Sequence, residues 1–418
     1  MPIEDQILQI AEDAKKASKI IGNLSSQLKN DALTKMSDEL LAQSHVLKRE
    51  NDKDLQAAKK KGLPNALIDR LTLSDATIQA MAEGLREVAM LPDPVGQVTG
   101  MWRRPNNLLV GKVRIPLGVI GIIYESRPNV TADAAGLCLK SGNAAILRGG
   151  SEAVHSNVAI AKVLQESMQE VGIPKETIQV IPVPDRAAVY EILKLEDFID
   201  LIIPRGGEEL IRSVVANSRI PVIKHYKGVC HLFVDKSADY TMAEDIIVNA
   251  KVQRPGVCNA LETLLIHKDI ASNVLPPLIR RLQDEGVEVR GCPKVLEIVS
   301  GLKEAKEEDW FQEYLDLILA IKVVNDLDEA IVHISKYGSL HTEAIVTSDY
   351  ENSQKFLKEV NSSVVLVNAS TRFNDGNQLG LGAEIGISTT KLHAFGPMGL
   401  EELTTSKFIV YGNGQIRS

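Results

Sequence analysis

The chain contains 418 residues, of which 44% are hydrophobic and 24% are charged, and its net charge is −8 at pH 7. This composition predicts a folded globular protein of two or three domains and excludes disordered, collagen-like and disulfide-rich proteins. The negative charge argues against nucleic acid or an anionic membrane as a partner, and the 4% aromatic content leaves little surface for base stacking.

Residues 1–90 have a helical pattern. Apolar residues recur every three or four positions between Ile3 and Ile21, and Ser74 is a candidate N-cap for a later helix. The N-terminus is acidic and amphipathic, unlike a secretory signal, and no apolar run reaches the about 18 residues of a membrane-spanning helix. We therefore expect a cytoplasmic protein without a membrane partner.

Residues 97–114 are rich in turn formers and lead into a strand. Trp102 lies there beside Arg103 and Arg104. An aromatic residue flanked by arginines is typical of a contact surface, and we favour a subunit contact over a substrate contact.

From residue 115 onward, short β-branched runs alternate with helical patterns. This alternation predicts an α/β fold with parallel sheets covered on both faces, arranged as two α/β domains. The strand-like runs are residues 117–125, 143–150, 178–183, 200–207, 221–226 and 231–235, and then 262–267, 287–291, 320–324, 343–348 and 362–370.

Two glycine turns follow strands of the first series and open helices. Their residues are Arg148, Gly149, Gly150 and Ser151 in one turn, and Arg205, Gly206 and Gly207 in the other. Backbone N–H groups at such turns can bind a phosphate, and an adjacent arginine can add a bidentate contact. The alternative is that glycine serves backbone geometry alone, since neither turn has a complete dinucleotide or P-loop motif.

Cys258 is the cysteine with a context that suggests chemistry. It follows a turn made by Pro255 and Gly256, lies between a helix and a strand, and has Arg254 nearby. Such a thiol can be activated as a nucleophile, whereas a lone cysteine is more often a small buried apolar residue. Cys138 fits that second description. With no CxxC pair and no histidine pair at metal-ligand spacing, we expect reduced thiols and no bound metal.

Several segments resemble one family of enzymes. They are residues 124–153, 200–207, 252–265 and 377–412. These segments are similar to the γ-glutamyl phosphate reductases (glutamate-5-semialdehyde dehydrogenases) of the aldehyde dehydrogenase superfamily, and the similarity runs essentially end to end. The resemblance implies an NADP(H)-binding, Rossmann-like domain over residues 1–96 and 115–228 and a catalytic domain over 229–403. It also implies a bridging β-excursion over 97–114 and 404–418 that makes homo-oligomers.

The resemblance also implies a reaction. Cys258 would attack the acyl carbon of L-glutamyl 5-phosphate, expel phosphate and form a thioester, which NADPH reduces to L-glutamate 5-semialdehyde in L-proline biosynthesis. Asn129 is the nearest match to the asparagine that stabilises the oxyanion in the superfamily, although its spacing to Gly142 is shorter than the common pattern. A CoA-acylating aldehyde dehydrogenase and a non-catalytic binding protein on the same fold remain the alternatives.

Two departures from the superfamily concern the cofactor side of the site. The stretch that begins at His225 replaces a motif whose glutamate activates water, which suits a thioester that must not be hydrolysed. His393 replaces the glutamate of a second motif, whereas Phe395 is kept and is implied to pack near the nicotinamide. Arg148 stands where a lysine contacts the adenosine ribose or its 2′-phosphate, which favours NADP(H) over NAD(H).

The substrate needs groups for a carboxylate, an ammonium and a phosphate. Glu125, Arg127 and Arg254 are candidates by charge type, and structural ion pairing is an equal alternative for each. The resemblance also suggests glutamate 5-kinase as a partner that would hand over the labile substrate.

Overall fold

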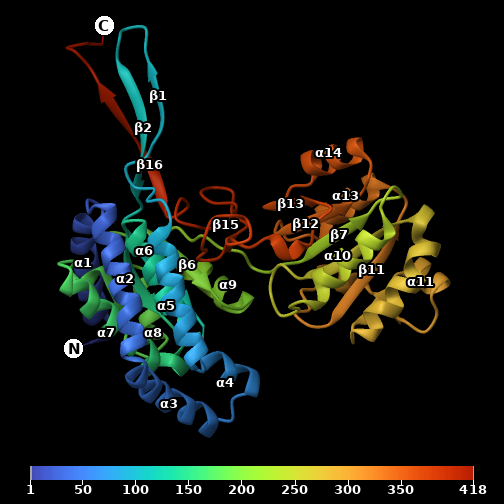
Figure 1. The fold of residues 1–418 in the computed structure, drawn as a ribbon, viewed down its shortest axis with the longest axis horizontal. Helices are drawn as coiled ribbons and strands as arrows, with labels where there is room; N and C mark the ends of the chain where they lie inside the picture. Colours follow the sequence, from blue (N-terminus) through green and yellow to red (C-terminus); the bar gives the residue numbers. More distant parts are fainter. Residues whose placement is uncertain (1, 126, 418) are drawn as a thin grey trace. The chain divides into compact units, whose positions relative to one another are not determined.

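The computed structural model describes residues 2–125 and 127–417. They form two compact units (Figure 1). The first unit comprises Met1–Lys224, Gly380–Gly386 and Met398–Ser418, and the second comprises His225–Leu379 and Ile387–Pro397. The chain therefore crosses between the units at residues 224/225, 379/380, 386/387 and 397/398. The expected boundary after residue 228 lies near the first of these crossings.

The first unit contains a parallel sheet of four strands in the order β5-β4-β3-β6. The strands are β3 (Val119–Tyr124), β4 (Ala144–Arg148), β5 (Ile178–Val180) and β6 (Leu201–Arg205). In the register of the sheet, Arg148 lies opposite Ile123, and Arg205 lies opposite Tyr124. Both glycine turns of the sequence therefore begin at the same, carboxyl edge of this sheet.

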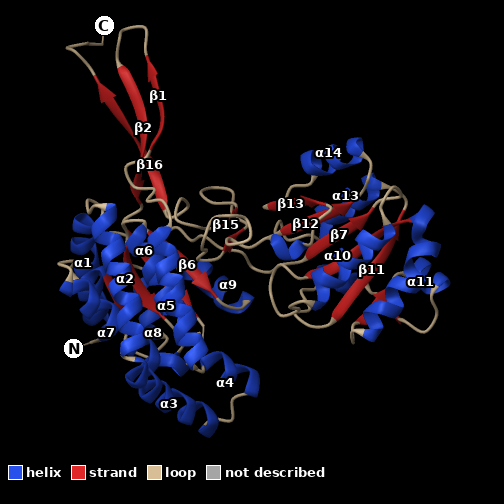
Figure 2. Ribbon diagram, viewed as in Figure 1, coloured by secondary structure: helices blue, strands red, loops and turns tan. Residues whose placement is uncertain are grey.

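Helices cover both faces of this sheet (Figure 2). On β3, Val119 and Ile123 belong to a core formed with Ile7 of α1, whereas Ile120 and Ile122 point to the other face and are equally buried. The helices of the unit are α1 (Ile3–Ile21), α2 (Ser26–Ala42), α3 (Ser44–Lys60), α4 (Asn65–Leu71), α5 (Asp75–Met90), α6 (Asn129–Lys140), α7 (Val154–Glu170), α8 (Ala187–Ile192) and α9 (Glu208–Asn217). The predicted cap of α5 is confirmed, because Ser74 Oγ accepts the Thr77 N–H at 3.1 Å.

A three-stranded antiparallel sheet also belongs to the first unit (Figure 1). It joins β1 (Val98–Arg103) and β2 (Leu109–Pro116) to β16 (Thr404–Tyr411), so that segments from the two predicted parts of the β-excursion form one sheet. Trp102 lies edge-on to Phe408 with 6.3 Å between the ring centroids, and both side chains are exposed.

The second unit contains a parallel sheet of seven strands in the order β10-β9-β11-β8-β7-β12-β13. Leu264 of β8 packs in a core with α10, α11 and α12, and the next residue, Leu265, packs in another core with α13 and α14. The strands are β7 (Cys230–Val234), β8 (Leu261–His267), β9 (Glu288–Gly291), β10 (Lys303–Glu304), β11 (Ile318–Val324), β12 (Thr342–Val346) and β13 (Val364–Val367). The helices are α10 (Tyr240–Val252), α11 (Lys268–Asp284), α12 (Pro293–Ile298), α13 (Leu327–Tyr337) and α14 (Tyr350–Glu359), and β14 (Ile387–Ser388) pairs with β15 (Gly396–Pro397). Two parallel sheets covered by helices confirm the predicted α/β fold.

One predicted strand is wrong. Residues 221–226 form no strand, and only Val222 makes an isolated bridge, to Ile202 at the edge of the first sheet. Pro221 has no N–H to donate to a ladder, and the chain passes from the first unit to the second directly afterwards. Among the helices of residues 2–125 and 127–417, none is long and apolar enough to cross a membrane.

Candidate active site

Cys258 lies on the loop that joins α10 to β8, in the second unit. The loop is held at its end by the Val257 carbonyl, which accepts the Ala260 N–H at 3.1 Å, and Cys258 is half-buried. Cys138, Cys230 and Cys292 are buried instead. Burial raises the pKa of Cys138 to about 12 and that of Cys230 well above its ordinary value, so both stay protonated. The structure places Cys258 on the turn between helix and strand that the sequence predicted.

Gly228 allows the chain to pass directly beside this loop. A Cβ at Gly228 would lie 1.9 Å from the Cys258 carbonyl oxygen, which only glycine avoids. The Gly228 N–H donates to Glu313 Oε1 at 2.9 Å, and the Cys230 thiol donates to the Cys258 carbonyl at 3.1 Å. The segment before β7 and the Cys258 loop are therefore fixed against each other through main-chain atoms.

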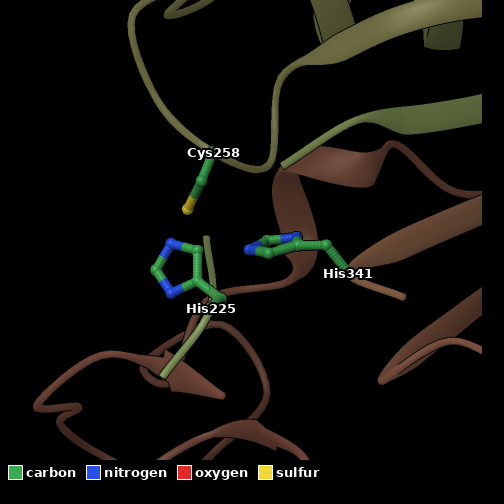
Figure 3. Close-up of side chains that lie close together, drawn as sticks. All are labelled: His225, Cys258 and His341. Atoms are coloured by element: carbon green, nitrogen blue, oxygen red, sulfur yellow. The ribbon is translucent and has the colours of Figure 1, made fainter. Parts of the chain in front are cut away.

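Two imidazoles face Cys258 (Figure 3). One ligand-forming atom from each of His225, Cys258 and His341 lies within 4.8 Å of the other two. His225 was predicted at the cofactor side, whereas His341 was missed. His341 lies directly before β12, and the strand order β8-β7-β12 brings it to Cys258 from a distant part of the chain. Burial, followed by the nearby His225, lowers the pKa of His341 to about 3, so its imidazole is neutral.

Arg372 is a second residue that sequence reasoning missed. It lies on a 3₁₀ turn, η4 (Thr371–Phe373), after β13, and is half-buried. Its Nε donates to Gln253 Oε1 at 2.8 Å, and its Nη1 donates to Asn259 Oδ1. These partners flank Cys258 on the same loop. Burial and then the positive charge of Arg254 lower the pKa of Arg372. The arginine that is hydrogen-bonded to the Cys258 loop is thus Arg372. Arg254, which was predicted to contact substrate, is exposed.

His225 also contacts the segment that carries Phe395. Its Nδ1 lies 2.8 Å from the Ile387 carbonyl oxygen, on β14, and β14 pairs with β15, which begins directly after Phe395. Phe395 is half-buried, and Lys391 Nζ lies 5.2 Å from its ring centroid. The structure therefore places two residues predicted for the cofactor side, His225 and Phe395, on connected segments of the second unit.

The other cofactor candidates lie at the carboxyl edge of the sheet in the first unit. Arg148 is buried, and its guanidinium donates to the carbonyls of Gly149 at 2.9 Å and Pro184 at 3.0 Å, whereas its Nε has no hydrogen-bond partner. A Cβ at Gly149 would lie 2.1 Å from Asn157 Nδ2, so this glycine is required for close packing. Gly150 and Ser151 are half-buried, and Ser151 opens the 3₁₀ turn η1 (Ser151–Ala153) before α7.

The second glycine turn binds a carboxylate of the protein itself. Glu125 Oε1 accepts the Gly207 N–H at 3.0 Å, at the start of α9, and a Cβ at Gly206 would lie 2.6 Å from the same carboxylate. Arg205 donates to the Ile385 carbonyl. Glu125, predicted to contact substrate, therefore occupies the helix N-terminus where a cofactor phosphate was expected.

Asn129 and Arg127 lie in the segment that follows β3 in the first unit. Asn129 is the first residue of α6, and its Nδ2 donates to Asp133 Oδ2 at 3.1 Å. The Arg127 N–H donates to the Glu125 carbonyl at 2.6 Å. The structure thus places Asn129 and Arg127 beside Glu125 in the first unit, whereas Cys258 belongs to the second unit.

Known proteins share both the sequence and this fold. Residues 4–290 match the model of the aldehyde dehydrogenase family. The chain belongs to this family of oxidoreductases, in the branch of the γ-glutamyl phosphate reductases. It is 67% identical to a protein named γ-glutamyl phosphate reductase from Geobacter metallireducens and 66% identical to one from Geotalea daltonii, over 100% of each chain in both comparisons.

Solved structures agree with this assignment. The crystal structure of γ-glutamyl phosphate reductase from Thermotoga maritima has a TM-score of 0.97 and 47% identity, with 99% of this chain and 100% of that chain covered. An acetylating aldehyde dehydrogenase from Geobacillus thermoglucosidasius has a TM-score of 0.71 at 18% identity, over 100% of this chain and 98% of that one, and shares the fold. The aldehyde-dehydrogenase-like fold expected from the sequence is confirmed.

Proposed function

We propose that this protein reduces L-glutamyl 5-phosphate to L-glutamate 5-semialdehyde with NADPH, as a step of L-proline biosynthesis. The observation that carries the proposal is the half-buried Cys258, on a loop bound by Arg372 and faced by two imidazoles, in a chain 66–67% identical over its length to proteins named γ-glutamyl phosphate reductase.

Cys258 is the nucleophile of the proposed reaction. Its thiolate attacks the acyl carbon, a C–S bond forms, and the C–O bond to phosphate breaks with its electron pair leaving on the phosphate. Acyl phosphate needs orientation more than acid catalysis, and Arg372 has the charge and the fixed position to orient a phosphate or a carboxylate next to the thiolate. When hydride has been delivered to the thioester carbon, the C–S bond breaks and the thiolate is regenerated.

The residues that would hold the cofactor are Arg148, Gly150 and Ser151, with Phe395 and His225 on the nicotinamide side. The three residues of the first unit fit the phosphate-bearing part of a dinucleotide, because Arg148 Nε is a buried donor without a hydrogen-bond partner at the carboxyl edge of a parallel sheet. NADPH, when bound, would supply the hydride. The protein must stabilise the negative charge that develops on the acyl oxygen, and we propose the Cys258 N–H and the Asn129 side-chain amide as the hydrogen-bond donors.

We also propose that the protein forms a homo-oligomer through the sheet of β1, β2 and β16. In the strand order β1-β2-β16, one edge of β16 faces no strand of the described chain. Exposed apolar side chains cluster on this sheet, namely Val98, Met101, Trp102, Phe408, Val410 and Tyr411. A long strand with an open edge and apolar faces is suited to pairing with a second copy of the chain.

The reaction is tested in the reverse direction, with glutamate semialdehyde and NADP⁺. NADPH formation is measured with inorganic phosphate, with CoA, and with neither, for the wild type and for Cys258→Ala, with Cys292→Ala as the matched thiol control. Phosphate-dependent turnover that is lost in Cys258→Ala alone is the expected result. Dependence on CoA instead would assign the protein to the CoA-acylating enzymes, and turnover in Cys258→Ala would remove the thioester mechanism.

A further inference from the structure

Three side chains that could bind a metal ion converge in the second unit. His225 precedes β7, Cys258 precedes β8 and His341 precedes β12, and these three strands are neighbours in the parallel sheet. One nitrogen or sulfur atom from each lies within 4.8 Å of the other two. In Figure 3, a ring nitrogen of each histidine points toward the sulfur of Cys258 or the space beside it.

The contact of His225 Nδ1 with a carbonyl fixes which ring nitrogen carries the proton. Nδ1 lies 2.8 Å from the Ile387 carbonyl oxygen, and because a carbonyl only accepts, Nδ1 carries the proton. Nε2 is then the nitrogen with a lone pair. A histidine whose second nitrogen donates to a backbone carbonyl is the usual arrangement of a metal ligand.

His341 supplies an independent observation. Its ring is buried, its Nδ1 lies 2.7 Å from Thr342 Oγ1, and its Nε2 has no hydrogen-bond partner. Burying a polar nitrogen without a partner is unfavourable, and a bound cation would satisfy it.

We propose that His225, Cys258 and His341 form a binding site for Zn²⁺, which blocks the thiol reversibly. One thiolate and two imidazoles are ligands that zinc prefers, and a fourth position stays open for water. Tetrahedral zinc needs about 3.3–3.6 Å between ligand atoms, so the side chains must move together by about 1 Å. Binding forms the Zn–S bond and releases the thiol proton to solvent. The sequence could not suggest this site, because its ligands are far apart along the chain.

Zn²⁺ and an acyl substrate would compete for the same sulfur. That consequence rests on the proposed function, whereas metal binding itself does not. Zinc is therefore expected to inhibit competitively against glutamate semialdehyde in the reverse assay, and a chelator is expected to restore the rate.

The site is tested first by binding, on the full chain without substrate. Titration calorimetry with Zn²⁺ should give one site per chain, and Co²⁺ should produce the near-ultraviolet absorption of a cobalt–thiolate bond. Cys258→Ser should abolish that absorption, and His225→Gln should weaken zinc binding at least tenfold. His45→Gln, at an exposed histidine, and Cys292→Ala should bind as the wild type does.

The outcomes separate the two proposals. Equal zinc affinity in the wild type, Cys258→Ser and His225→Gln would overturn the metal site, as would the lack of a cobalt–thiolate band. His225 is half-buried and is preferred to the fully buried His341 as the test position, and circular dichroism confirms that each variant is folded. If the wild type gives a cobalt–thiolate band but shows no reductase turnover, the metal site is supported and the proposed function is contradicted.

Discussion

The buried ion pair of Lys251 and Glu262 should hold the ends of the Cys258 loop in place. Lys251 is in the last turn of α10 and Glu262 is in β8, so the pair closes the base of the loop, with 2.7 Å between Nζ and Oε2. Both side chains have no exposed surface, and the other hydrogen bond of Glu262 is a 3.3 Å contact from the Leu315 N–H. Lys251→Met keeps the length of the side chain and removes its charge.

The expected loss of stability follows from this burial. Removing one partner of a fully buried pair costs about 3–5 kcal/mol, because the remaining carboxyl must either stay charged without compensation or hold a proton above its ordinary pKa. Burial already raises the pKa of Glu262 to about 7, against the lowering effect of Lys251, and loss of Lys251 raises it further. The folded variant then keeps a proton that the unfolded chain releases near its ordinary pKa. Its stability therefore falls more than that of the wild type as the pH rises from about 5 to about 8.

Urea unfolding followed by tryptophan fluorescence measures this effect. The chain has two tryptophans, and in a Trp102→Phe background the signal comes from Trp310, which is buried in the core of the second unit. Lys355→Met, at the exposed pair with Asp328, is the matched control and should leave the free energy of unfolding nearly unchanged. The variant Lys251→Met/Glu262→Leu should recover most of the loss. A Lys251→Met protein within about 1 kcal/mol of the wild type at pH 8 would refute the reasoning.

Three further substitutions test the proposed function. Arg372→Ala should lower kcat/KM for the acyl phosphate by about 10- to 100-fold through loss of a charged contact, and an unchanged kcat/KM would place Arg372 outside the substrate site. Arg148→Ala should raise the KM for NADPH more than the KM for NADH in steady-state assays, and an equal rise for both would remove its role at the 2′-phosphate. Phe408→Glu should lower the mass measured by light scattering, because it places a charge on the exposed sheet of β1, β2 and β16, and an unchanged oligomer would show that this sheet is not the interface.

The order of strands and helices was largely predictable because their signals are local. The apolar period of α1, the cap at Ser74 and the β-branched runs of both sheets all lie within a few residues of the elements that they define. The position of Cys258 on a turn was predictable for the same reason, since the residues that form the turn, Pro255 and Gly256, lie directly before it in the sequence. The strand predicted over residues 221–226 was wrong, because a β-branched run does not reveal that the chain crosses between the two units there.

His341 and Arg372 were not predictable, because they reach Cys258 through the order of strands in the sheet. β7, β8 and β12 are neighbours in space, but β8 and β12 are separated along the chain by several other elements. The contact of Glu125 with the Gly207 N–H escaped prediction for a related reason. A glycine turn indicates that an anion can bind, but it does not indicate that the end of a neighbouring strand already supplies one.

The repeated crossing of the chain between the two units has a consequence for biosynthesis. Residues 225–379 leave the ribosome as one continuous segment that contains the whole seven-stranded sheet, so this sheet can form early. The first unit begins earlier but finishes last. Its β2 pairs with β16, and the buried Asn143 donates its Nδ2–H to the Leu403 carbonyl at 2.8 Å, so neither contact can form before residues 403–411 have been synthesised. The nascent chain therefore leaves β2 without its partner strand until β16 has been synthesised, and the open edge of β2 is exposed to other chains during that time.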